Sequence, residues 1–154
     1  MCKICRNEIT ENTIILDCFN CPTLKAIPVI PSLCVLLVSK CPSLISISAQ
    51  PKLTALFCSY CPLLEDISPM PNLVNLNCTN CPMLKLISLF PKLTDLICVE
   101  CSSITFIPSL PQLKLLFRDK CARLVRIEHL PNLKFSDLSL ALINKLNQGP
   151  IHFE

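Results

Sequence analysis

The most reactive side chains in this sequence belong to its thirteen cysteines. Two Cys-x-x-Cys pairs near the start have the spacing of a zinc ribbon, in which four sulfur ligands surround the metal tetrahedrally. These four thiols are those of Cys2, Cys5, Cys18 and Cys21. The pair recurs at 58/61, 78/81 and 98/101, yet Val38 and Arg118 occupy its first position in two other units. A position that accepts valine favours packing over ligation, so we expect buried structural cysteines and no metal, with zinc at the first four as the alternative.

Catalysis is not expected, because a nucleophilic cysteine needs a neighbouring base and a polar, accessible setting. Neither His129 nor His152 lies in the segments that contain the recurrent cysteines. Cys5 and Cys34 stand outside the recurrent pair positions of the full units and are expected to be the most reactive thiols. A single glycine excludes glycine-rich phosphate loops. We therefore expect no enzyme activity, no cofactor and no small-molecule substrate.

The cysteines belong to a repeat of twenty residues, in which columns of equivalent positions recur without insertion. Proline stands at 31, 51, 71, 91, 111 and 131, cysteine at 21, 41, 61, 81, 101 and 121, leucine at 33, 53, 73, 93, 113 and 133 and again at 16, 36, 56, 76, 96 and 116, and isoleucine at 27, 47, 67, 87, 107 and 127. One unit cannot bury enough apolar surface to offset the entropy of ordering its own backbone. The units are therefore expected to stack into a repeat solenoid.

The unit 71–90 shows how each repeat is expected to fold. The alternation Leu76-x-Cys78 predicts a short strand with one buried face. Pro82 ends that strand, because proline cannot donate a hydrogen bond to a β-ladder. Further prolines occur in the second half of several units, which predicts an extended, polyproline-like or 3-10 segment there rather than an α-helix.

The pattern L-x-x-L-x-C-x-x-C-x-x-L-x-x-I-(P/S) resembles the leucine-rich repeat, with cysteine where the familiar form has asparagine. Its short, proline-containing units are similar to those of secreted bacterial effectors and of leucine-rich repeat proteins from giant DNA viruses. The resemblance covers residues 13–135. It implies a horseshoe or arc with a parallel β-sheet on the concave face, a surface that the family commonly uses to bind proteins.

The repeat array divides the chain into three parts. Residues 13–135 are expected to form six repeats. Residues 1–12 are expected to be an irregular N-terminal cap or a shortened repeat, because Asn7 lies fourteen residues, not twenty, before Cys21.

A capping helix and a tail are expected over 136–154, where the repeat pattern ends. Ser136 is a good N-cap, and an apolar stripe follows it. Gly149-Pro150 stops the helix, which is predicted near 137–148. Such a helix would cover the open end of the core.

Composition sets further limits on function. The chain is 51% hydrophobic and 16% charged, with a net charge of +3, too small to indicate nucleic acid or an anionic membrane by itself. Residues 111–134 contain six basic and two acidic residues, which we interpret as a solvated face rather than a nucleic-acid site. No apolar run is long enough for a membrane span, and we expect no secretory signal. We therefore expect the protein to lie in the cytoplasm, where its thiols stay reduced, and in the host cytoplasm if the chain is viral.

The residues between the inward columns are expected to face outward on the sheet. They vary between units, whereas the inward columns are nearly invariant, so packing does not dictate them. The proposed partner-binding residues are Leu37, Phe57, Tyr60, Asn77, Ile97, Glu100, Phe117 and Lys120. Apolar and aromatic anchors with a polar rim are typical of protein interfaces, although single exposed apolar residues are also normal.

The sequence thus favours a non-enzymatic module that recognises a protein partner. Two alternatives stay open: a cysteine-rich scaffold that responds to metal or redox state, and a partial repeat array without an independent role.

Overall fold

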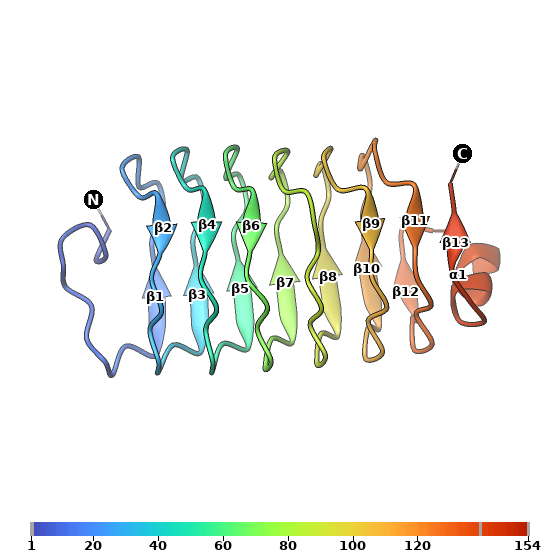
Figure 1. Cartoon of the computed structure of the whole chain (residues 1–154), viewed down its shortest axis with the longest axis horizontal. Coiled ribbons are helices and arrows are strands. Elements are labelled where there is room, and N and C mark those ends of the chain that lie inside the picture. Colours follow the sequence, from blue (N-terminus) through green and yellow to red (C-terminus); the bar gives the residue numbers. More distant parts are fainter. Residues whose placement is uncertain (1, 139, 154) are drawn as a thin grey trace.

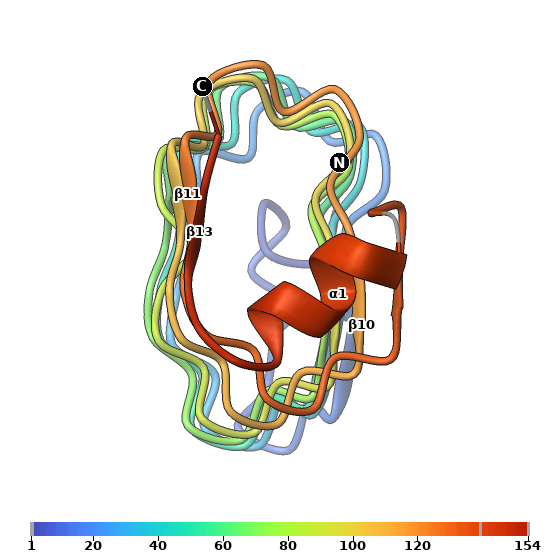
Figure 2. The ribbon, with the colours of Figure 1, turned by 90° about the vertical axis from the view of Figure 1, so that its right-hand side faces the viewer.

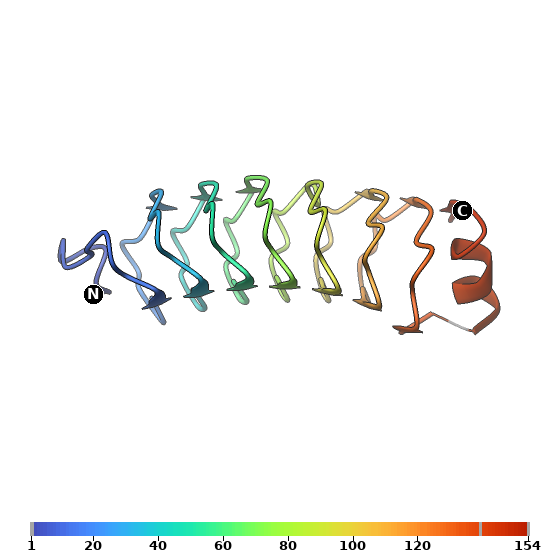
Figure 3. The same ribbon diagram turned by 90° about the horizontal axis from the view of Figure 1, so that it is seen from below.

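Each repeat forms one turn of an elongated β-solenoid, and successive turns stack side by side (Figure 1). The computed structural model of the chain describes residues 2–138 and 140–153. Seen along the long axis, the turns follow nearly the same closed path, so that equivalent residues lie over one another (Figure 2). The predicted repeat solenoid with a parallel sheet is confirmed. The array bends only slightly (Figure 3), and the horseshoe shape stays a prediction.

The longest sheet contains one short strand from each turn. Its seven strands, in spatial order, are β1 (Ile15–Asp17), β3 (Val35–Leu37), β5 (Ala55–Phe57), β7 (Asn75–Asn77), β8 (Asp95–Ile97), β10 (Leu115–Phe117) and β12 (Phe135–Ser136). All neighbours are parallel, and each residue pairs with the one twenty positions later, as Leu56 does with Leu76. In the unit 71–90, strand β7 begins one residue earlier than expected and ends before Cys78, although the Cys78 amide still donates to the Ile97 carbonyl at 2.9 Å.

The opposite side of the solenoid also forms short strands, which the sequence did not predict beyond an extended backbone. One sheet contains β2 (Ala26–Ile27), β4 (Ser46–Ile47) and β6 (Asp66–Ile67), all parallel. A second contains β9 (Phe106–Ile107) and β11 (Arg126–Ile127), with β13 (Ile151–His152) antiparallel to β11.

The break between these two back sheets has a visible cause in hydrogen bonding. In the first sheet, the amide of Ser68 donates to the Ile47 carbonyl at 3.0 Å. One turn later the hydroxyl of Ser88, at 2.8 Å, donates to the Ile67 carbonyl. In the next turn Pro108 has no N–H to donate at all. The ladder is therefore interrupted between β6 and β9.

Two β-turns in each repeat explain most of the prolines. One turn runs from the residue before the proline column to the leucine after it, as in the 3.0 Å bond from the Leu33 amide to the Ile30 carbonyl across Pro31. The other spans the Cys-Pro-x-Leu segment, as in the 3.1 Å bond from the Leu64 amide to the Cys61 carbonyl. Proline at the second position of a β-turn has the required φ and needs no donor there.

The core consists of the repeated leucine, isoleucine and cysteine columns. Leu36, Leu56, Cys58 and Cys98 are fully buried, as predicted for the inward positions. Burial of these columns between stacked turns stabilises the array, since one turn alone leaves both of its faces open to water.

The two ends differ from the repeats. Residues 3–7 form turns rather than a strand, closed by a 3.2 Å bond from the Arg6 amide to the Cys2 carbonyl. After the last repeat comes helix α1 (Leu140–Leu146), which is shorter than the helix predicted over 137–148; residue 139 lies outside the described residues. Its Ile143 and Leu146 side chains are buried. Among the described residues, no helix is both long and apolar enough to span a bilayer.

Candidate functional site

The central column of predicted binding residues lies on the outer face of the seven-stranded sheet. Parallel pairing with a twenty-residue register places Leu37 beside Phe57 and Phe57 beside Asn77. The column continues through Ile97 to Phe117 in the same way. Phe57 is 36% exposed and Phe117 is 37% exposed, while Leu37, Asn77 and Ile97 are half-buried. The structure therefore aligns these side chains in one row.

A second outward column on the same sheet was missed by the sequence reasoning. Each strand has two outward positions around its buried leucine, and only the later one was considered. The earlier column contains Ile15, Val35, Ala55, Asn75, Asp95, Leu115 and Phe135. Ile15 and Phe135 are 60% and 64% exposed. The two-residue alternation around the buried leucine is the sequence signal that would have found it.

Together the two columns form what we call the sheet face, and its apolar residues fall into two patches. The patch towards the N-terminus contains Ile15, Val35, Leu37, Ala55 and Phe57, and the patch towards the C-terminus contains Ile97, Leu115, Phe117 and Phe135. Between them lie the polar side chains of Asn75, Asn77 and Asp95.

Asn77 is held in place by its neighbours in this polar division. Its Oδ1 accepts hydrogen bonds from the Thr79 amide at 3.0 Å, the Thr79 hydroxyl at 2.8 Å and the Ser59 hydroxyl at 3.2 Å. Because Oδ1 is fixed by three donors, the amide group of this side chain has a defined orientation on the face.

Tyr60, Glu100 and Lys120 lie at the edge of the sheet face, in the turn that follows each strand. All three adopt left-handed backbone conformations, with φ of 57°, 60° and 58°. Lys120 Nζ pairs with a Glu100 carboxylate oxygen at 2.6 Å, and the other oxygen accepts from Asn80 at 3.0 Å. This hydrogen bond with Glu100 raises the pKa of the Lys120 ammonium. The edge is therefore polar, and the charges of Glu100 and Lys120 cancel each other. The Tyr60 side chain adds an exposed aromatic ring to this edge.

The basic residues of the last repeat are also partly neutralised. Arg126 pairs with Glu128 at 2.6 Å, and Lys120 with Glu100 as above. The Arg118 guanidinium lies 5.1 Å from the centre of the Phe153 ring. These contacts leave fewer free cations on this unit than its sequence suggests.

The column of cysteines at 41, 61, 81, 101 and 121 forms a buried ladder. Each thiol donates to a backbone carbonyl of the preceding turn, as Cys81 does to Cys58 at 3.0 Å and Cys101 to Cys78 at 2.9 Å. These carbonyls belong to the residue after each strand. The ladder gives this cysteine column a hydrogen-bonding role in addition to packing.

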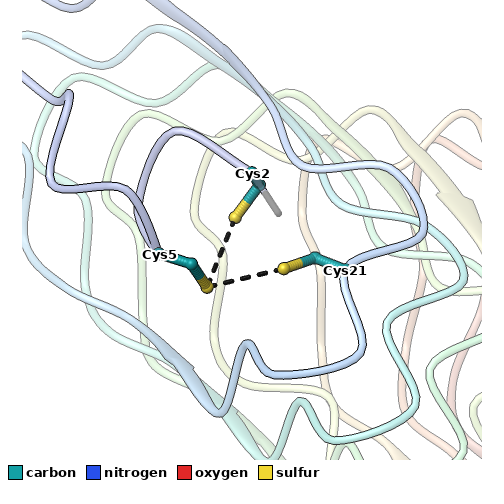
Figure 4. Close-up of side chains that lie close together, drawn as sticks. All are labelled: Cys2, Cys5 and Cys21. Carbon is teal, nitrogen blue, oxygen red and sulfur yellow. Dashed lines mark hydrogen bonds between the residues drawn. The ribbon is translucent and has the colours of Figure 1, made fainter.

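Cys21 is the member of the column that lies against the N-terminal segment instead of a preceding turn. Its Sγ lies 3.4 Å from that of Cys5, which in turn lies 3.8 Å from Cys2 Sγ (Figure 4). The three sulfur atoms all lie within 4.8 Å of one another, and we call them the thiol cluster. The fourth residue of the predicted zinc alternative, Cys18, is buried and its thiol contacts that of Cys2, but it is not among these three mutually close sulfur atoms.

The thiol cluster has a distinct electrostatic environment. Burial raises the pKa of Cys21, but hydrogen bonds from the Cys2 backbone and from the Cys5 thiol outweigh it and lower this pKa to about 6. For Cys18, burial raises the pKa. Cys5 and Cys34, predicted to be the most reactive thiols, are the two partly exposed cysteines, whereas the remaining eleven are buried.

Comparisons with protein-family models, with curated proteins and with solved structures found no match to this chain.

Proposed function

We propose that the chain is a non-enzymatic recognition module of the leucine-rich repeat type that binds a protein partner on the sheet face. The main support is the contrast between two sets of side chains. The inward columns repeat leucine, isoleucine and cysteine in nearly every turn, whereas the outward columns change from apolar to polar to charged. Packing accounts for the first set and leaves the second free to serve binding.

The sheet face offers a suitable surface for this role. Its short strands and rigid backbone ladder hold the side chains in fixed positions, which reduces the entropy lost on binding. Phe57 and Phe117 would act as the aromatic anchors of the two apolar patches. Asn77 and the Glu100–Lys120 pair would contribute specificity, because a partner has to match their hydrogen bonds and charges.

The finer architecture expected from the resemblance is part of the same proposal. The sheet face would be the concave side of a shallow arc. Helix α1 would close the C-terminal end of the core, in keeping with its buried Ile143 and Leu146.

Affinity capture with matched variants tests the proposal. The chain would be used as bait in a lysate of its native cell, alone and as the double variant Phe57→Ser, Phe117→Ser. The control is Leu86→Ser, Leu89→Ser, which removes two apolar side chains that are more exposed, at 61% and 66%, and lie off the sheet face. We expect the specific partner to be lost about 100-fold or more only with the first variant.

Thermal melting of both variants shows whether folding is affected. Equal capture by the sheet-face variant, with an unchanged melting temperature, would contradict the proposed anchors. Equal loss with the control variant would point to nonspecific hydrophobic adsorption.

A further inference from the structure

We propose that Cys2, Cys5 and Cys21 form a zinc-binding site at the N-terminal end of the solenoid. This site is separate from the proposed recognition surface and does not depend on it. The first argument is geometric. Sulfur ligands of a tetrahedral zinc ion lie about 3.8 Å apart, since each is about 2.3 Å from the metal. The Cys2–Cys5 separation of 3.8 Å equals this spacing, the Cys5–Cys21 separation of 3.4 Å is slightly shorter, and all three sulfur atoms lie within 4.8 Å of one another.

The second argument concerns how the ligands are positioned. Cys2 and Cys5 are joined by a tight turn, in which the Arg6 amide donates to the Cys2 carbonyl and the Glu8 amide donates to the Lys3 carbonyl at 2.9 Å. The side chains of Cys2, Cys5 and Cys21 approach from different directions, and their sulfur atoms point towards one another (Figure 4). Two ligands from a Cys-x-x-Cys turn and a third from a distant segment are a usual arrangement in zinc sites.

The third argument is that Cys21 has no ladder acceptor. Elsewhere in its column the thiol donates to a carbonyl of the preceding turn, as Cys41 does to Cys18 at 2.9 Å. Cys21 instead contacts Cys5 and, at 3.9 Å, the Thr23 hydroxyl. Its thiol is therefore not engaged with a backbone carbonyl of a preceding turn, unlike those of the rest of the ladder.

Charge and access also suit a cation with thiolate ligands. Three thiolates around Zn²⁺ leave one net negative charge, and the exposed cation Lys3 belongs to the same turn as Cys2 and Cys5, whereas Arg6 is paired with Glu8 at 3.1 Å. An open groove lined by Cys2, Lys3, Arg6, Asp17 and Phe19 leads to one side of the cluster. Three protein ligands leave the fourth position of a tetrahedral zinc ion to a water molecule.

A competition titration of the reduced 154-residue chain with Zn²⁺ against a coloured chelator tests the site. We expect one zinc ion per chain, and after replacement by Co²⁺ the intense visible bands of tetrahedral cobalt with a sulfur-to-metal charge-transfer band. Cys5→Ser is expected to weaken binding about 100-fold or more, because it removes a thiolate ligand. Cys5 is only partly buried, so this variant retains the core.

Two control variants make the result specific. Cys34→Ser changes the other partly exposed thiol, which donates to the Ser32 carbonyl at 3.4 Å, and should bind zinc as the unmodified chain does. Cys18→Val introduces the residue that Val38 provides in the same column; it removes a thiol that contacts Cys2 but is not one of the three proposed ligands, and should also retain binding. Loss of binding in Cys18→Val would overturn the three-ligand assignment.

Thermal melting gives a second readout. Zinc should raise the melting temperature of the unmodified chain and of Cys34→Ser but not of Cys5→Ser, because a ligand stabilises only the state that binds it. Absence of stoichiometric zinc in the reduced chain, or equal affinity in Cys5→Ser, would overturn the site. The sheet-face variant Phe57→Ser, Phe117→Ser should bind zinc normally, so this test is independent of partner recognition.

Discussion

At the scale of single residues, Gln50 is the one polar side chain buried in the core of the described residues. Its column otherwise contains Ile30, Met70, Phe90 and two leucines. Gln50 Oε1 accepts from the Ile30 amide at 2.8 Å, and its Nε2 donates to the Pro28 carbonyl at 2.7 Å. The side chain thus satisfies two backbone groups of the preceding turn that would otherwise be buried without a partner.

Replacing Gln50 with Met is expected to lower the free energy of unfolding by about 1–3 kcal/mol, although methionine is more apolar, because the Ile30 and Pro28 groups lose their partner. Urea denaturation measures this change. Met70→Leu is the matched control in the same column and should cost less than about 1.5 kcal/mol. Equal effects of the two substitutions would show that side-chain volume, not hydrogen bonding, determines the result.

At the scale of elements, the turn after each strand requires a left-handed residue. Asn20, Lys40, Asn80 and their equivalents have φ between 51° and 60°, and none of these positions contains glycine. Asparagine tolerates this region, whereas β-branched residues do not. Backbone conformation, as well as solvent exposure, therefore limits which residues can stand in this column.

Lys40→Val is expected to destabilise the fold by about 1–2 kcal/mol, because valine strains the left-handed backbone. Lys40→Asn loses the same contact of Lys40 Nζ with the Phe19 ring, 5.3 Å away, but introduces a residue that tolerates this backbone, so it should be more stable than Lys40→Val. Chemical denaturation of both variants measures the difference.

The control for this prediction is Lys25→Val, in an exposed extended segment next to β2, which should change stability by less than about 0.5 kcal/mol. A loss at Lys25 as large as that at Lys40 would indicate a general cost of removing surface charge.

At the scale of the whole molecule, the buried thiols make stability depend on pH above neutrality. The adjacent Cys101 thiol and burial raise the pKa of Cys78, and the Cys121 thiol and burial raise that of Cys98. The folded state therefore retains these protons where the unfolded state, with a thiol pKa of about 8.5, releases them. The stabilisation is complete below about pH 8.5 and is lost progressively as pH rises towards the folded pKa values.

Each such thiol is expected to lower the free energy of unfolding by about 1.4 kcal/mol per pH unit above that point. Denaturation midpoints at about pH 8 and about pH 10 measure the slope. The double variant Cys78→Val, Cys98→Val introduces the residue that Val38 provides in the same column, and should show a flatter alkaline decline. An identical slope would mean that other groups determine it.

The repeat made most of the fold predictable. Leucine at 16, 36 and 56 indicates a column of inward side chains. From this column we could predict the approximate position of the strands, their parallel pairing and the burial of the cysteines. The back sheets were not predictable in this way. Pairing in these sheets depends on whether the residue after each two-residue strand donates its amide to a carbonyl of the preceding turn. Ser68 donates its amide, whereas Ser88 donates its hydroxyl and Pro108 has no N–H to donate.

The candidate sites were predicted in part. The row from Leu37 to Phe117 lies on the sheet as expected, but the parallel column with Ile15 and Phe135 was overlooked. Spacing alone grouped Cys18 with the other three early cysteines. In the structure the Cys18 thiol still contacts that of Cys2, but it is not one of the three sulfur atoms that all lie close to one another. The local turn that brings Cys2 and Cys5 towards Cys21 contains no periodic signal.

The uniform register has a consequence for how such a chain can change over generations. Since each parallel strand pairs with the one twenty positions later, a coding segment of one whole unit within the repeats can be duplicated or deleted from any starting phase, and each inward column still meets its match. An insertion or deletion that is not a whole number of units shifts the leucines out of the interior. Growth or shrinkage by whole units would lengthen or shorten the outer face while leaving the interior unaltered.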